Sequence, residues 1–177
     1  MVAPRVSPIG NLAQFKWRLK GCNTLRMAVY FECRTRTKMP MSELFDLARS
    51  IDAHKESMRQ SHENAIGGVT SGLISLDEEV TWRAWHFGVP IRMTSRITEM
   101  QKPDYFVDEQ VRGPFQRFRH VHEFSQDSNG TTMVDRIEFA APFGPVGRLA
   151  EKLVLGRYLR RLIEVRNRHL AGEPDLQ

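Results

Sequence analysis

The stretch Gly113–Phe139, GPFQRFRHVHEFSQDSNGTTMVDRIEF, decides the fold. In each half, hydrophobic and polar side chains alternate with a period of two, as in a strand with one buried face. The segment SQDSNG at 125–130 separates the halves and has the composition of a short connection between antiparallel strands. We therefore predict a β-hairpin whose strands cover 115–124 and 131–139.

Charge distinguishes the two faces of the first predicted strand. One face has no permanently charged side chain and consists of Gln116, Phe118, His120, His122 and Phe124. The opposite face carries the charged residues Arg117, Arg119 and Glu123. Because charged side chains stay in contact with water, the face with both histidines is predicted to be the inner one.

Asp135 lies on the inner face of the second predicted strand, between two apolar residues, Met133 and Ile137. A carboxylate at this position requires a partner, because removing an unpaired charge from water is costly. The nearest candidates across the hairpin are His120 and His122. Arg160 and Arg166, later in the chain, are alternative partners.

Further strands and helices surround this hairpin in the sequence. Alternation predicts strands at 28–37, 64–70, 78–87, 91–100 and 105–111. Apolar residues at helical spacing predict two short helices within 42–58 and a long helix over 146–170. Short connections between consecutive strands are typical of antiparallel sheets. This order predicts an α+β fold in which the long helix packs on one face of the sheet.

Length and composition indicate one globular domain. The chain has 177 residues, 41% of them hydrophobic, and no apolar run approaches the roughly 20 residues of a membrane-spanning helix. Five of the 26 basic residues lie in 1–27, which contains no acid, so the remaining 21 bases balance the 21 acids. The body of the protein is therefore formally neutral, and we expect no nucleic-acid partner.

The expected domain boundaries follow from composition. Residues 1–27 are predicted to be a poorly ordered basic extension, 28–171 the folded domain, and 172–177 a tail. The first 27 residues lack the compact apolar region of a secretory signal, and Met27 is a candidate for the natural start, which N-terminal sequencing of the native protein would test. Cys22 and Cys33 do not have a metal-type spacing and are expected to be reduced thiols of a cytoplasmic protein.

Two motifs resemble those of a known superfamily. They are GPFQRFRHVHEF at 113–124 and NGTTMVDRIEFAAPFGPVGRLAEKLVLGRYLRRLIEVRN at 129–167. Both are similar to the SRPBCC superfamily, the START, birch-pollen-allergen and polyketide cyclase/dehydrase-like group, although Phe118 stands where the pattern often has Trp. The resemblance covers about residues 28–170. It implies a helix-grip fold, in which a curved antiparallel sheet wraps around a long C-terminal helix and two short helices follow the first strand.

The resemblance also implies an elongated cavity between sheet and helix that usually takes an apolar ligand. The alternation of side chains predicts its lining as Trp82, Ala84, His86, Ile91, Met93, Ser95, Ile97, Phe118, Phe124, Met133 and Ile137. Arg166 of the long helix is predicted to reach the same cavity. Methionine and aromatic side chains adapt to ligands of varied shape. Simple filling of a core is the alternative interpretation of these residues.

His120, His122 and Asp135 admit three interpretations. They are familiar metal ligands, but no HExxH or CxxC motif and no further histidine on the hairpin supports such a site, so we expect no metal and no cofactor. A histidine oriented by a carboxylate can also act as a general base, for example in cyclisation or dehydration of a polyketide-like chain. The interpretation we favour is a polar network that fixes the sheet or orients the polar end of a ligand.

The sequence thus predicts intracellular binding of an apolar or amphipathic small molecule, lipid-like or polyketide-like. A cyclase or dehydratase that uses a cavity histidine is the alternative. A protein-interaction module is a third class, suggested by the basic residues of the last helix: Arg157, Arg160, Arg161, Arg166 and Arg168. We expect no membrane span, and the sequence leaves the oligomeric state open.

Overall fold

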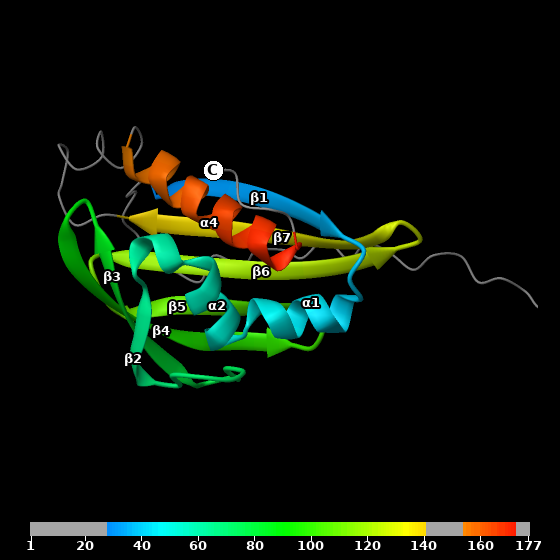
Figure 1. Cartoon of the computed structure of the whole chain (residues 1–177), viewed down its shortest axis with the longest axis horizontal. Coiled ribbons are helices and arrows are strands. Elements are labelled where there is room, and N and C mark those ends of the chain that lie inside the picture. The colour runs from blue at the N-terminus through cyan, green and yellow to red at the C-terminus, as the bar shows by residue number, and fades with distance from the viewer. Residues whose placement is uncertain (1–27, 141–153, 173–177) are drawn as a thin grey trace, which may run out of the picture.

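The computed structural model describes residues 28–140 and 154–172, which form one antiparallel sheet and the helices packed on it (Figure 1). The strands are β1 Val29–Thr37, β2 Asn64–Gly68, β3 Glu79–His86, β4 Val89–Gln101, β5 Tyr105–Arg112, β6 Arg117–Asp127 and β7 Gly130–Ala140. They are hydrogen-bonded in the order β1-β7-β6-β5-β4-β3-β2. The helices are α1 Met41–Ala48, α2 Ile51–Ser57, the short 3-10 helix η1 Arg59–Ser61, and α4 Gly156–Leu170.

The helices of the described residues lie on one face of the curved sheet. Figure 1 shows α4 running along β1 and β7, with α1 and α2 beside it over the middle strands. The predicted α+β helix-grip architecture is therefore confirmed. The predicted C-terminal helix corresponds to α4 from Gly156 onward, whereas residues 141–153, where we placed its start, lie outside the described residues. The same holds for residues 1–27 and 173–177.

The predicted hairpin is present as β6 and β7, and its strands are longer than expected. Pairing continues to Asp127 opposite Gly130, so the turn is much shorter than the predicted six-residue connection. Gly130 has a φ of +134°, and a Cβ there would lie 2.3 Å from the carbonyl oxygen of Thr37. A glycine at this point lets the hairpin approach the end of β1 closely. The register places His122 directly opposite Asp135.

The β3–β4 hairpin corrects a second boundary. Phe87 and Gly88 both have positive φ, 53° and 74°, which is the geometry of a tight two-residue turn. As a result β4 begins at Val89 and contains Pro90, although we expected the strand to begin at 91. Proline is tolerated there because β5 pairs with β4 only from Thr94 onward, so this part of β4 is an edge.

The core is divided between two groups of buried side chains. Under α1, Phe45 packs edge-on against Phe106 and Phe124, with ring centroids 5.5 and 5.3 Å apart. Leu44 and Met133, both with no exposed surface, belong to the same group. A second group under α4 consists of Phe31, Cys33, Phe118, Ile137 and Phe139. One end of the sheet is thus filled by α1, and this decides where free space remains.

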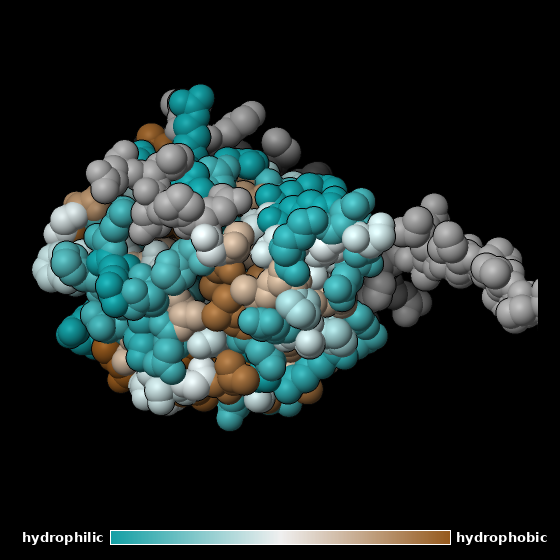
Figure 2. Space-filling model, turned by 45° about the vertical axis from the view of Figure 1, so that its right-hand side comes forward, coloured by the Kyte–Doolittle hydropathy of each residue, from teal (hydrophilic) through white to brown (hydrophobic). Residues whose placement is uncertain are grey.

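Hydrophilic residues cover much of the face shown in Figure 2, with hydrophobic residues gathered in small areas between them. Several large apolar residues are exposed near the β3–β4 turn, namely Trp85, Phe87 and Val89. Among the described residues, no helix combines the length and hydrophobicity needed to cross a bilayer.

Cys33 is predicted to resist thiol reagents in the folded protein. Burial raises the pKa of its thiol from 9.0 to about 11, so very little thiolate exists at pH 8.5, and the thiolate is the reactive form. Mass spectrometry after iodoacetamide treatment should find the Cys33 peptide unmodified under native conditions and alkylated in denaturant. Rapid native alkylation of this peptide would contradict the prediction. Because only the folded state keeps the thiol neutral above pH 9, this contribution to stability falls as pH rises from about 9 to 11.

Candidate functional site

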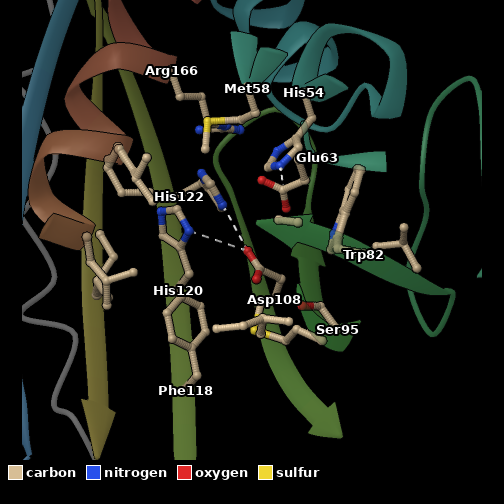
Figure 3. Close-up of a pocket in the computed structure, with 18 of the residues that line it drawn as sticks. His54, Met58, Glu63, Trp82, Ser95, Asp108, Phe118, His120, His122 and Arg166 are labelled. Carbon is tan, nitrogen blue, oxygen red and sulfur yellow. Dashed lines mark hydrogen bonds and ion pairs between the residues drawn. The ribbon is translucent and has the colours of Figure 1, made fainter. Parts of the chain in front are cut away.

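A cavity of about 210 Å³ lies between the sheet and the helices (Figure 3). Its wall is mostly apolar and is built mainly by α2, α4 and the strands from β3 to β6, with single residues from α1, β1 and β7. Ten of the predicted lining residues are present in it: Trp82, Ala84, His86, Ile91, Met93, Ser95, Ile97, Phe118, Ile137 and Arg166. Whether these side chains bind a ligand stays a prediction. The structure places the other two, Phe124 and Met133, in the core under α1 and not in the cavity wall.

Asp135 holds the buried polar network together. Its side chain is fully buried, and its Oδ1 accepts a hydrogen bond from His120 Nε2 at 2.8 Å. His122 Nδ1 lies 2.8 Å from the same oxygen. On the other side, Oδ2 accepts a hydrogen bond from Asn167 Nδ2 at 2.6 Å. Asp135 therefore lies behind the two histidines, which themselves line the cavity.

Asp108 is a fourth member of this network that the sequence analysis missed. Its Oδ2 accepts a hydrogen bond from His122 Nε2 at 3.0 Å and lies 3.7 Å from His120 Nδ1. Figure 3 shows both imidazoles directed toward this carboxylate. The β5–β6 register explains the contact, because Asp108 is directly opposite His120. The alternation of side chains in the sequence does not reveal this contact, because it depends on how β5 and β6 pair.

The two carboxylates of the network are ionised. Burial opposes this for Asp135, but hydrogen bonds from His120 and His122 outweigh it and hold its pKa well below the ordinary value. Burial also opposes ionisation of Asp108, yet the hydrogen bond from His122 lowers its pKa. For His120, burial lowers the pKa and the neighbouring His122 lowers it further, which favours a neutral ring. The site thus combines two fixed negative charges with a neutral imidazole.

Arg166 connects this network to the helices. The side chain is 5% exposed, its guanidinium lies 3.8 Å from Asp135 Oδ1, and it donates to the carbonyl oxygen of Ala48 at 2.6 Å. Of the two arginines proposed as partners of Asp135, Arg166 is therefore the one nearby, whereas Arg160 donates to the backbone oxygen of Glu32. Arg166 also points inward, so it does not belong to a basic surface of the last helix.

A second polar group lies across the cavity. Glu63 Oε1 is 3.4 Å from His54 Nε2, and the His54 ring stacks on Trp82 with centroids 4.3 Å apart. Burial opposes ionisation of Glu63, but the neighbouring His54 lowers its pKa. The helical spacing of Ile51, His54 and Met58 could have identified His54 as inward-facing. Glu63 lies outside any periodic element, so the sequence contains no signal for it.

Aromatic contacts join β3 and the β3–β4 turn to α4 in the cavity wall. His86 Nδ1 is 2.7 Å from the hydroxyl of Tyr158, which links β3 to α4. The Phe87 ring lies 4.6 Å from the Tyr158 ring. Burial lowers the pKa of His86. The predicted cavity residue His86 therefore joins strand and helix at this edge.

Comparison with known proteins gives matches in structure but not in sequence. No protein-family model matches the chain, and no curated protein matches it. An aromatase/cyclase from Streptomyces sp. R1128 has a TM-score of 0.65 at 10% identity, over 82% of this chain and 93% of that one. TTHA0849 from Thermus thermophilus has a TM-score of 0.64 at 15% identity, and the match covers 81% of this chain and 98% of that one. The major latex-like protein 151 of Panax ginseng has a TM-score of 0.62 at 12% identity, and the match covers 83% of this chain and 97% of that one.

These similarities identify the class of fold. The matched structures are nearly covered from end to end, and their identities are low, so the likeness concerns architecture alone. The chain has the helix-grip fold that we expected from its motifs. Within this fold, function has to be argued from the site.

Proposed function

We propose that the protein binds an apolar or amphipathic small molecule in the cavity. The main support is the contrast within the wall, which is predominantly apolar but carries the polar atoms of Asp108, His120 and His122 in one place. Such a combination of apolar surface and few convergent polar groups is typical of small-molecule sites. An apolar body would lie against residues such as Trp82 and Met93, with its polar end at the carboxylate.

The charge of this wall favours one kind of polar end. Asp108 is ionised and its side chain is 19% exposed. A carboxylate accepts hydrogen bonds but cannot donate them, so a hydroxyl or phenol on the ligand suits it and a second carboxylate is repelled. We therefore propose a neutral, hydroxyl-bearing ligand.

Displacement of a fluorescent probe tests this function. The chelator-treated protein is expected to bind the neutral probe N-phenyl-1-naphthylamine saturably at one site. A long-chain alcohol should displace it at lower concentration than the carboxylic acid of equal length. Native mass spectrometry of the freshly purified protein provides a second measurement, a bound molecule of defined mass. A protein that is empty and takes up no probe would contradict the proposal.

Catalysis is the second candidate, supported by His120, whose Nε2 donates to Asp135 at 2.8 Å and whose Nδ1 is left 3.7 Å from Asp108 in the cavity wall. A neutral ring oriented in this way can take a proton on Nδ1 from a carbon next to a carbonyl, which starts cyclisation of a poly-β-keto chain. The aromatase/cyclase among the similar structures has the same fold. Turnover of a poly-β-keto substrate that is lost in His120→Gln but kept in His54→Gln would support this activity. Equal loss in both variants, or no turnover by the unchanged protein, would contradict it.

A further inference from the structure

Three ligand atoms converge at the cavity wall in the pattern of a metal site. His122 Nε2 and His120 Nδ1 lie 3.0 and 3.7 Å from Asp108 Oδ2, and one ligand atom from each of these residues lies within 4.8 Å of the others. Neighbouring ligands on an ion with bonds of about 2.1 Å are roughly 3.0–3.4 Å apart. Small side-chain rotations would therefore place all three around one ion. Figure 3 shows both rings directed at Asp108.

The outer nitrogens of the same two rings face another carboxylate. His120 Nε2 donates to Asp135 Oδ1 at 2.8 Å, and His122 Nδ1 lies 2.8 Å from that oxygen. Metal-binding histidines commonly donate their outer N–H to a buried carboxylate, which fixes the ring and leaves the inner nitrogen free for the ion. Asp135 is fully buried and held in place by Asn167 at 2.6 Å.

His122 lies between the two carboxylates. Its Nε2 donates to Asp108 Oδ2 at 3.0 Å, and its Nδ1 is 2.8 Å from Asp135 Oδ1. One nitrogen of the ring therefore faces the proposed ion position and the other faces the outer carboxylate, which is the arrangement of a metal-binding histidine.

The position of Asp108 shows which side of the ion would have free coordination positions. Its side chain is 19% exposed, whereas those of His120 and His122 are 6% and 3% exposed. All three residues line the cavity. An ion held by three protein ligands keeps further positions for water or a ligand oxygen, and here those positions face the cavity.

We propose that Asp108, His120 and His122 bind a divalent transition-metal ion, with Asp135 as the outer partner of both histidines. Two imidazoles and one carboxylate suit Zn²⁺, Co²⁺ or Fe²⁺. From the sequence we expected no metal, because no HExxH or CxxC motif and no further histidine on the hairpin supported a site. The structure supplies Asp108 from β5 and moves Asp135 behind the rings. This site does not depend on an apolar molecule being bound.

Cobalt binding tests the proposal. The full chain, freed of metal by a chelator and dialysed, is expected to bind one Co²⁺ and to gain visible absorption bands typical of nitrogen and oxygen coordination. Loss of an outer partner commonly costs 10–100-fold in metal affinity, so we expect Asp108→Asn and His122→Gln to cost at least about 100-fold. The matched control Glu63→Gln changes another histidine-paired carboxylate of the same cavity and should bind Co²⁺ unchanged.

Several results would overturn the site. These are no stoichiometric Co²⁺ or Zn²⁺ binding by the unchanged protein, equal binding by Asp108→Asn, or loss of binding in Glu63→Gln. If circular dichroism shows that a variant does not fold, ¹⁵N NMR spectra of the unchanged protein test the site instead. Zn²⁺ should then shift His120 Nδ1 and His122 Nε2 while both outer nitrogens stay protonated, and shifts confined to other histidines would refute the proposal. Probe binding is a separate measurement, so either proposal can fail alone.

Discussion

Replacing Asp135 with asparagine is expected to lower the free energy of unfolding by about 3–5 kcal/mol, the usual cost of removing one partner from a buried ion pair. The substitution keeps the size of the side chain, so little of the loss comes from a cavity. It removes the charge next to Arg166, whose side chain is 5% exposed. Denaturant unfolding in the presence of a chelator measures the change without a contribution from bound metal.

Glu138→Gln is the matched control for this prediction. Glu138 lies on the same strand, β7, but its side chain is 36% exposed and faces Arg117 at 3.3 Å. Exposed ion pairs contribute about 0–1 kcal/mol, so this substitution is expected to have little effect. Similar losses in the two variants would show that Asp135 is not the centre of the buried network.

Exchanging a small wall residue for a large one should close the cavity. Ala84→Trp places an indole in a space of about 210 Å³ from a position that is 4% exposed. We expect the affinity for N-phenyl-1-naphthylamine to fall at least about tenfold, which corresponds to 1.4 kcal/mol. Overpacking costs about 1–3 kcal/mol of stability, so folding is checked by circular dichroism. Fluorescence titration then measures the affinity.

The neighbouring residue provides the control. Trp85 is on the opposite face of β3 and is 52% exposed, so Trp85→Ala should leave probe binding unchanged. Co²⁺ binding should persist in Ala84→Trp, because Ala84 is not a ligand of the proposed ion. Unaltered probe affinity in Ala84→Trp would mean that the probe binds elsewhere.

The sequence predicted the hairpin network because charge alternation there is unambiguous. Arg117, Arg119 and Glu123 mark the outer face of β6, which leaves both histidines inside. Asp108 was missed because β5 gives no such contrast. Phe106 and Val107 are neighbours on opposite faces, yet they are only 2% and 1% exposed. Where both faces of a strand are covered, alternation no longer distinguishes inside from outside.

The length of the cavity along the strands was harder to predict from the sequence than which side chains face inward. Period two assigned Phe124 and Met133 to the inner face correctly, but it does not show how far the cavity extends along a strand. Phe45 of α1 fills that end of the sheet by packing on Phe124. The position of α1 depends on long-range packing, which the local pattern of the sequence does not contain.

The pairing of β1 with β7 has a consequence for synthesis of the chain. Thr37 pairs with Thr131, so the first strand has to wait for nearly the last one before it joins the sheet. At about 5–20 residues per second, that delay is roughly 5–20 s. During this time Phe31 and Cys33, both buried in the finished protein, lack the strand beside them. The sheet can therefore close on this side only after β7 has been synthesised.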